Sequence, residues 1–173
     1  MKKNIDIIML GDSITGRANW KELLEEEHLV NLGIDGDTTF GILSRINRVV
    51  ELDPKFVFLM AGINDLLVSV PIDDVLANYK NILEVMKEND INTIVQSTLI
   101  TRMETVNKKI KSFNELLEEY CKKEGIKFLD LNYAFSDDND LLREGLTIDG
   151  LHLGQSAYKV WAYKLKQMEN YGF

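Results

Sequence analysis

Five short apolar runs, separated by longer segments with helical periodicity, constrain the fold of this chain more than any other feature. The runs cover residues 5–10, 29–32, 56–61, 91–95 and 126–131. Most are rich in branched or aromatic residues and lack polar alternation, a pattern typical of strands buried on both faces. Five such strands alternating with five helices predict an α/β fold, with a parallel sheet covered by helices on both sides.

The segments between the runs carry their apolar residues on helical stripes, and we expect these stripes to face the sheet. Thr38 or Thr39 is placed to cap the helix after the second run. The stripe of that helix consists of Phe40, Leu43, Ile46 and Val50. The later stripes consist of Val75, Tyr79, Ile82 and Met86, then Val106, Ile110, Phe113, Leu117 and Tyr120, and finally Ala157, Tyr158, Trp161 and Leu165.

Length and composition are those of one globular domain. The 173 residues include 20 basic and 28 acidic side chains, so the formal net charge is −8, and 45% of the residues are hydrophobic. No Pro-, Gly- or Ser-rich stretch marks a boundary, so residues 1–173 are expected to form a single domain. A net negative chain with no block of Lys or Arg is not expected to bind nucleic acid.

The cysteine content and the N-terminus bear on the compartment. Cys121 is the only cysteine, which excludes an intramolecular disulfide and a thiol-based structural zinc site, and its place on a helix favours a partly buried, inert thiol. The N-terminal apolar run is cut by Asp6 and lacks a small-residue cleavage site. No stretch approaches the roughly 20 apolar residues of a membrane span. We therefore expect a cytoplasmic protein without a membrane span.

Functional residues are expected just after the apolar runs, because ligands of open parallel sheets bind outside the carboxyl ends of the strands. Ser13 follows the first run and is either a helix N-cap, the interpretation favoured for a lone Ser, or a nucleophile. Gly36 follows the second run and either directs its backbone N–H into a site or belongs to a plain turn. Asn64 follows the third run as an oxyanion donor or an Asx-turn residue.

A candidate acid and base stand before the last helix, in the sequence Asp149-Gly150-Leu151-His152. A separation of three residues lets one compact turn bring the carboxylate to Nδ1 of the imidazole, which leaves Nε2 free to accept a proton. The other histidine, His28, follows three glutamates and is interpreted as a solvated helix end. A nucleophile, an oriented base and oxyanion donors together are what acyl transfer requires.

The four sequence blocks, in this order and spacing, resemble the GDSL esterase/lipase group, also called SGNH hydrolases. Residues 11–13 resemble the nucleophile block of that group, 31–38 its glycine block, 62–65 its asparagine block, and 149–152 its acid and base block. Many members have proline directly after the histidine, whereas Leu153 stands here. The resemblance implies a three-layer α/β/α sandwich around a five-stranded, flavodoxin-like parallel sheet. It also implies that residues 1–173 form a single SGNH-hydrolase-like catalytic domain.

The resemblance also implies a mechanism. Ser13 would attack an ester carbonyl, His152 would accept its proton, and Asp149 would hold His152. The Ser13 N–H, the Gly36 N–H and the Asn64 side chain would bind the oxyanion, and water would hydrolyse the acyl-enzyme. No metal or organic cofactor is required.

The blocks leave the substrate and the assembly open. We expect a serine esterase for short-chain acyl or acetyl esters, because no long insertion could form a lid and the net charge of −8 opposes anionic lipid surfaces. The alternatives are a lysophospholipase or thioesterase-type lipid hydrolase and, from another class, a non-catalytic α/β binding module. The oligomeric state is open, because Trp20, Tyr171 and Phe173 suit an interface as well as internal packing.

Other residues near the strand ends carry weaker predictions. Arg17 and Arg102 are expected to pair with surface acids rather than with a substrate anion. The acidic stretch 137–140 lacks the register of a calcium loop and is expected to be a solvated loop. Residues that either line an acyl pocket or pack in the core are Ile63, Leu66, Leu67, Leu99, Met103, Tyr133 and Leu151.

Overall fold

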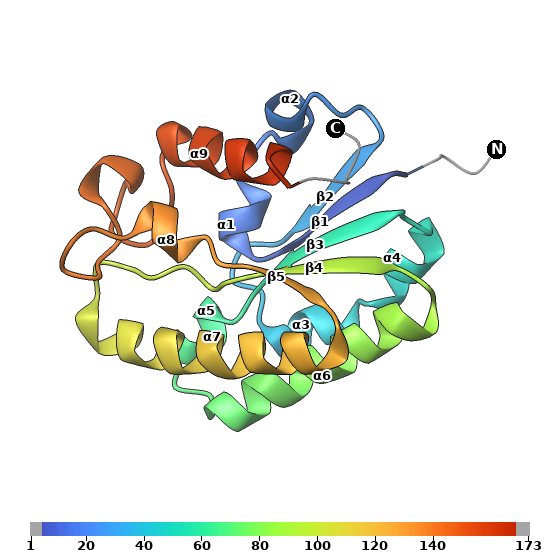
Figure 1. Cartoon of the computed structure of the whole chain (residues 1–173), viewed down its shortest axis with the longest axis horizontal. Helices are drawn as coiled ribbons and strands as arrows, with labels where there is room; N and C mark the ends of the chain where they lie inside the picture. Colours follow the sequence, from blue (N-terminus) through green and yellow to red (C-terminus); the bar gives the residue numbers. More distant parts are fainter. Residues whose placement is uncertain (1–4, 169–173) are drawn as a thin grey trace.

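A five-stranded parallel sheet forms the centre of the computed structural model, which describes residues 5–168 of the chain (Figure 1). The strands stand in the spatial order β2-β1-β3-β4-β5. They are β1 (Ile7–Gly11), β2 (Leu29–Gly33), β3 (Phe56–Met60), β4 (Asn92–Gln96) and β5 (Lys127–Leu129). Each strand begins and ends within two residues of one apolar run, and the order is that of a flavodoxin-like sheet. The predicted α/β fold is therefore confirmed.

Helices cover both faces of the sheet, which gives the three predicted layers (Figure 1). One face carries α1 (Ser13–Gly16), α2 (Trp20–Leu24) and α9 (Gln155–Lys166). The other carries α3 (Thr39–Ser44), α4 (Asn47–Leu52), α5 (Ile63–Leu67), α6 (Ile72–Glu88) and α7 (Glu104–Glu124). The connection from β5 to α9 contains α8 (Asn132–Phe135) and the 3-10 helix η1 (Glu144–Leu146).

The handedness of the connections explains this division of the helices. Crossovers between parallel strands are right-handed, so the direction of a connection along the sheet decides the face on which its helices lie. The connection from β1 to β2 runs one way, and those leading to β3, β4 and β5 run the other way. The chain therefore reverses direction beside β1, which places a ligand-binding crevice outside the carboxyl end of that strand.

The helical stripe predicted after β2 is wrong in two respects. The segment forms two helices, α3 and α4, and the same splitting produces α1 with α2 and α5 with α6. Phe40 was expected to face the core but is 68% exposed. Ile46, a predicted stripe residue, is buried as expected, and the other buried apolar residues of this segment are Ile42 and Val49, which were not part of the predicted stripe. Leu43 and Val50 are partly buried.

Hydrogen bonds at the start of α3 set its orientation. Thr38 is the N-cap, because its hydroxyl accepts the N–H of Gly41 at 3.1 Å. Thr39, the first residue of the helix, is buried and bonded to the buried carboxylate of Asp65 through its N–H (2.9 Å) and its hydroxyl (2.7 Å). Ile42 lies one turn later on the same side. Pairing of Thr39 with Asp65 thus turns Phe40 outward.

The later stripes are confirmed almost completely. In α6 and α9 every predicted stripe residue is buried, and in α7 only Tyr120 is partly exposed. Helix α7 ends at Gly125, whose φ of +70° is the left-handed conformation usual after a helix C-terminus. These helices pack on the sheet to form the hydrophobic core.

The structure bears on the expectations for the cysteine, for the aromatic residues and for a membrane span. Cys121 is fully rather than partly buried, and burial raises the pKa of its thiol to about 12, which disfavours the reactive thiolate. Trp20 packs inside the domain, edge-on against Trp161 with ring centroids 4.8 Å apart, whereas Tyr171 and Phe173 lie outside the described residues. Within residues 5–168, no helix has both the length and the apolar character of a membrane span.

The strand register brings the predicted functional segments to one edge. Gly11, the last residue of β1, is paired with Gly33 of β2 and with Met60 of β3. The carboxyl ends of these neighbouring strands are therefore level. The loops that follow them carry Ser13, Gly36 and Asn64.

Candidate active site

Ser13 is the first residue of α1 and stands two residues after Gly11, the last residue of β1. The N-cap of this helix is Asp12, whose carboxylate accepts the N–H of Ile14 at 2.9 Å. The N-cap interpretation of Ser13 is therefore wrong, and its hydroxyl is not used in capping. Ser13 Oγ instead lies 3.2 Å from Nε2 of His152.

Asp149 orients His152 because its carboxylate accepts hydrogen bonds from both the ring and the backbone of His152. One carboxylate oxygen lies 2.7 Å from Nδ1 of the ring, and the other accepts the His152 backbone N–H at 2.7 Å. Together with the N–H of Leu151, these donors lower the pKa of Asp149 to about 2. A carboxylate ionised in this way can only accept, so Nδ1 of the ring donates to it, and in the matching neutral tautomer Nε2 faces Ser13 as an acceptor.

The loop that carries the candidate acid and base, Asp149 and His152, is held by Thr147. Its hydroxyl donates to the carbonyl of His152 at 2.7 Å and accepts the N–H of Gly150 at 2.9 Å. Thr147 also pairs with Leu153 in an antiparallel bridge. Leu153 is buried. Leucine at this position therefore packs inward and takes part in holding the loop.

Gly36 occupies a turn that is closed by a hydrogen bond from the N–H of Asp37 to the carbonyl of Ile34 at 3.1 Å. Its φ is +75°, and a Cβ at this position would meet no atom of the described chain within 4 Å. The backbone conformation, rather than a lack of space, favours glycine here. The turn leaves the Gly36 backbone at an open part of the edge.

Asn64 extends its side chain from α5 to this same turn. Its Nδ2 donates to the carbonyl of Asp37 at 2.8 Å, so the Asx-turn interpretation of Asn64 is not supported. An amide nitrogen carries two N–H bonds, and one of them remains for an acyl oxygen. The structure thus brings the predicted donors Gly36 and Asn64 together through Asp37.

Comparison with known proteins identifies the group to which this arrangement belongs. Residues 9–160 match the sequence model of the GDSL-like Lipase/Acylhydrolase family. The chain belongs to this family. It is accordingly a hydrolase of the GDSL/SGNH group, as its four sequence blocks indicated.

Three relatives of this GDSL hydrolase show how much of each protein is similar to this chain. A GDSL-like lipase from Bacteroides thetaiotaomicron has 26% sequence identity and a TM-score of 0.86, with 96% of this chain and 88% of that chain covered. The platelet-activating factor acetylhydrolase IB subunit alpha2 of Rattus norvegicus is 25% identical over 90% of this chain and 72% of that protein. An N-acylneuraminate cytidylyltransferase of Streptococcus agalactiae is 32% identical over 87% of this chain, which spans only 35% of that enzyme.

Asn31 supports the GDSL site but was missed by sequence reasoning. Its side-chain nitrogen donates to the carbonyls of Gly16 (3.0 Å) and Ala18 (3.1 Å), and its oxygen accepts the N–H of Gly33 at 2.9 Å. These bonds attach the end of α1 to β2. A lone Asn inside the apolar run 29–32 was the signal that could have shown this role.

Asp12 was also missed. It is 1% exposed, and its Oδ2 has no hydrogen-bond partner within the described part of the chain. Burial raises the pKa of Asp12 to about 7, and the nearby carboxylates of Asp37, Asp65 and Asp35 add to this effect. The residue next to the candidate nucleophile of this GDSL hydrolase is thus a carboxyl that stays largely protonated below neutral pH.

The arginines and the acidic loop near the GDSL site have the structural contacts that were expected. Arg17 pairs with Asp35 at 2.8 Å, and Arg102 pairs with Asp137 at 3.2 Å. In the 137–140 loop, Asp137 also accepts backbone N–H groups of the loop itself. His28 is exposed, but it lies in the turn before β2 rather than at a helix end. Across residues 5–168, no three His, Cys, Asp or Glu side chains gather as metal ligands would.

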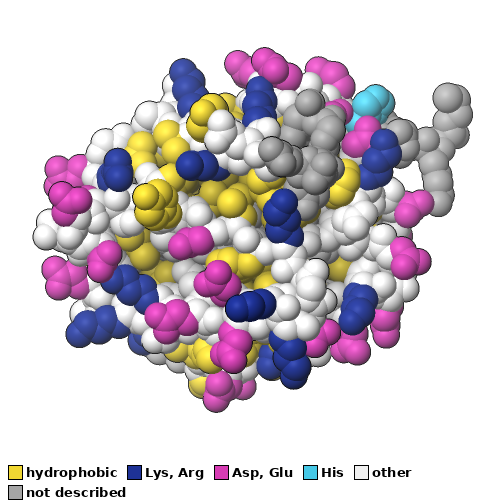
Figure 2. Space-filling model, in the orientation of Figure 1, with side chains coloured by type: hydrophobic (Ala, Val, Ile, Leu, Met, Phe, Trp, Pro, Cys, Tyr) yellow, Lys and Arg dark blue, Asp and Glu magenta, His cyan; other side chains and the backbone are white. Residues whose placement is uncertain are grey.

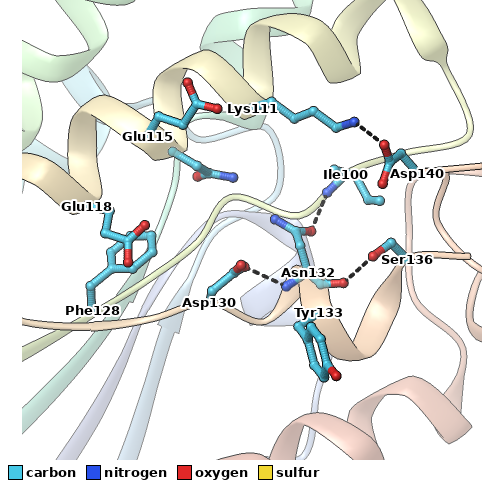
Figure 3. A pocket seen from close by; sticks show the side chains of 11 residues that line it. Ile100, Lys111, Glu115, Glu118, Phe128, Asp130, Asn132, Tyr133, Ser136 and Asp140 are labelled. Atoms are coloured by element: carbon cyan, nitrogen blue, oxygen red, sulfur yellow. Dashed lines mark hydrogen bonds and ion pairs between the residues drawn. The ribbon is translucent and has the colours of Figure 1, made fainter. Parts of the chain in front are cut away.

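A cavity of about 280 Å³ lies between α7 and the β5–α8 segment (Figure 3), and its lining contains none of the predicted catalytic or oxyanion residues. Figure 3 shows Asn132 at its centre, with its oxygen accepting the N–H of Ile100 at 2.9 Å. Lys111 reaches across to Asp140 at 2.8 Å. Because these polar groups already have partners in the protein, we interpret the cavity as part of the scaffold.

Several large apolar side chains are exposed in segments that follow the strands or precede Asp149. Of the predicted acyl-pocket residues, Met103 and Tyr133 are exposed, whereas Ile63, Leu66 and Leu99 are buried in the core. Apolar side chains are also visible between charged ones on the face shown in Figure 2. The exposed large apolar residues that follow the strands or precede Asp149 are Ile34, Phe40, Val68, Met103, Tyr133 and Ile148.

Proposed function

We propose that this GDSL hydrolase is a serine esterase that cleaves short-chain carboxylic esters through Ser13, His152 and Asp149. The observation that carries the proposal is the continuous chain of contacts from Ser13 Oγ to His152 Nε2 (3.2 Å) and from His152 Nδ1 to Asp149 (2.7 Å). Nucleophile, base and orienting acid stand in the sequence that acyl transfer needs. They lie at the sheet edge where this fold binds its ligands.

The first half of the reaction forms an acyl-enzyme. Ser13 Oγ attacks the ester carbonyl carbon while its proton passes to Nε2 of His152, and Asp149 stabilises the imidazolium that results. The carbonyl π electrons move onto oxygen. Collapse of this intermediate breaks the bond to the alkoxy group, which takes the proton from Nε2 and leaves as the alcohol.

The second half of the reaction uses the same groups. His152, neutral again, takes a proton from water as the water oxygen attacks the acyl carbon. The second tetrahedral intermediate collapses, and Ser13 Oγ recovers the proton from His152 as the acid product leaves. The charge on oxygen is stabilised in both halves by the N–H groups of Ser13 and Gly36 and by the amide of Asn64.

A short acyl group is supported by similarity and by charge. The acetylhydrolase subunit of Rattus norvegicus covers 90% of this chain and carries the acetyl specificity in its name. The net charge of −8 opposes binding to anionic lipid surfaces. The Streptococcus agalactiae relative gives no support to a cytidylyltransferase activity here, because this chain spans only 35% of that enzyme.

A second candidate function is hydrolysis of lipid-like esters. Exposed apolar residues such as Phe40 after β2 and Ile148 beside Asp149 favour it because they could contact a long acyl chain. The non-catalytic binding module is not favoured, since Ser13, Asn64, Asp149 and His152 are all present. The cytoplasmic location and the lack of a nucleic-acid partner stay predictions.

The proposal is tested by hydrolysis of a series of 4-nitrophenyl esters from acetate to palmitate, together with acetylated sugars. We expect the highest kcat/KM for the acetyl and butyryl esters. A maximum at the long-chain esters would instead establish the lipid hydrolase. Ser13→Ala should remove hydrolysis, whereas Ser112→Ala, on the exposed face of α7, should retain it. Wild-type activity in the Ser13→Ala variant would exclude Ser13 as the nucleophile.

A further inference from the structure

Arg45 connects the segments that carry the oxyanion donors. It lies at the C-terminal end of α3, and its side chain is 22% exposed. Two of its nitrogens, Nε and Nη2, lie 2.8 Å and 2.7 Å from the same carboxylate oxygen of Asp37. The Asp37 side chain is 11% exposed, so this ion pair is weakly screened by solvent. Nη2 also donates to the carbonyl of Gly11 at 3.2 Å.

Asp37, which Arg45 holds, is hydrogen-bonded within the segments of two of the proposed oxyanion donors. Its N–H closes the turn that contains Gly36, by donating to Ile34 at 3.1 Å. Its carbonyl accepts the side-chain N–H of Asn64 at 2.8 Å. Its carboxylate is held by Arg45. The position of Asp37 therefore fixes the Gly36 turn and the Asn64 amide together.

Gly11 connects Arg45 with the segment of the third proposed donor, the N–H of Ser13. It ends β1 and stands two residues before Ser13, whose N–H is the remaining proposed donor. Its carbonyl accepts both the N–H of Ile34 at 3.1 Å and the guanidinium of Arg45. The guanidinium thus bridges the nucleophile segment and the turn that carries Gly36.

We propose that Arg45 and Asp37 form a positioning pair for ester hydrolysis, which sets the Gly36 N–H and the Asn64 amide relative to Ser13. The proposal rests on the esterase function above. A planar guanidinium can contact a carboxylate and a carbonyl at the same time with fixed geometry, whereas the ammonium of lysine is a flexible point charge. The residue type at position 45 should therefore matter beyond its charge.

Removal of the guanidinium should lower the rate of the chemical step. Misplacement of catalytic groups by about 1 Å can cost about 100-fold in rate, so we expect Arg45→Met to lower kcat by about 10- to 100-fold with KM changed less than about threefold. Arg45→Lys should restore part of this loss. Arg48→Met is the matched control, because Arg48 is exposed on α4 and pairs with Glu51, and it should keep the wild-type kcat.

A double-variant cycle separates positioning from a general structural effect. If Arg45 acts through Asn64 and Gly36, its removal should matter less once Asn64 is absent. In an Asn64→Ala background we expect Arg45→Met to lower kcat by no more than about threefold. The positioning role would be overturned if the factor by which kcat falls in the double variant equalled the product of the factors in Arg45→Met and Asn64→Ala. Thermal unfolding of each variant shows whether its fold is retained.

The outcomes distinguish this proposal from the function on which it rests. If the wild-type protein hydrolyses no ester of the series, or if Ser13→Ala retains activity, the proposed function fails and the positioning pair fails with it. If wild type is active, Ser13→Ala is inactive and Arg45→Met keeps the wild-type kcat, only the positioning pair is overturned. Should Arg45→Met not fold, Arg45→Lys decides: a wild-type kcat in that variant overturns the proposal, and a lowered kcat with a retained melting temperature supports it.

Discussion

Asp12 shows how the fold changes the chemistry of a single residue. An aspartate in the unfolded chain loses its proton near pH 3.8, whereas burial raises the pKa of Asp12 in the folded protein to about 7. Between these values the folded state binds more protons than the unfolded state. The contribution of Asp12 to the free energy of unfolding is therefore greatest below about pH 4 and decreases as the pH rises to 7.

The variant Asp12→Asn tests this linkage. Asparagine caps helices as well as aspartate does and does not titrate. We expect the unfolding free energy of Asp12→Asn, relative to wild type, to increase as the pH rises from 4.5 to 7 and to level off above 7. One pKa unit corresponds to about 1.4 kcal/mol. Urea unfolding at several pH values measures the difference, and a difference that does not vary with pH would contradict the shifted pKa.

Asn64 is predicted to act on the transition state rather than on substrate binding. Loss of one oxyanion donor usually lowers kcat by about 100- to 1,000-fold, so we expect that loss for Asn64→Ala with little change in KM. The control is Asn47→Ala, since Asn47 is exposed on α4. Steady-state kinetics with 4-nitrophenyl acetate provides both constants. A change confined to KM would count against the oxyanion role.

The sequence was sufficient for residues whose role depends on local spacing. Asp149 and His152 are three residues apart, and one turn brings their side chains within 2.7 Å. Arg45 and Asp12 could not be assigned in this way. Their roles depend on Gly11 and Asp37 being adjacent in space and on burial by other segments, and neither property is visible in local sequence.

At the scale of elements, long helices were easier to predict than short ones. Helix α6 repeats its apolar stripe over 17 residues, so its period identifies the buried face. Helix α3 has only six residues, and its buried face is set by the pairing of Thr39 with Asp65 in α5. A contact between residues distant in sequence therefore decided the orientation of Phe40.

The packing of α2 on α9 depends on Trp20. Its ring contacts Trp161 and Tyr158 edge-on, and its Nε1 donates to the carbonyl of Thr15 at 2.8 Å. We expect Trp20→Ala to lower the free energy of unfolding by about 3 to 5 kcal/mol, as for other large buried aromatic side chains. Tyr163→Ala, at an exposed position of α9, is the control. Chemical denaturation would refute the packing if the loss were below about 1 kcal/mol.

At the scale of the whole molecule, the sheet topology explains why distant residues form one site. Ser13 and His152 are 139 residues apart in the chain, yet Ser13 follows β1 at the point where the chain reverses direction in the sheet. The alternation of apolar runs and helical segments was sufficient to predict that the segments carrying these residues end at one edge of the sheet. The alcohol and acyl parts of the substrate were not predictable, because they depend on loop side chains around the edge.

The most direct test of the proposed mechanism is covalent labelling of the protein with a 4-nitrophenyl alkylphosphonate. Attack of Ser13 Oγ on phosphorus would expel nitrophenolate and leave a stable adduct. We predict one adduct per folded chain by intact mass, located on Ser13 by peptide mass spectrometry, absent in Ser13→Ala and formed more slowly in His152→Gln than in the His28→Gln control. Folded wild-type protein without an adduct on Ser13, or equal labelling of Ser13→Ala, would contradict Ser13 as the nucleophile.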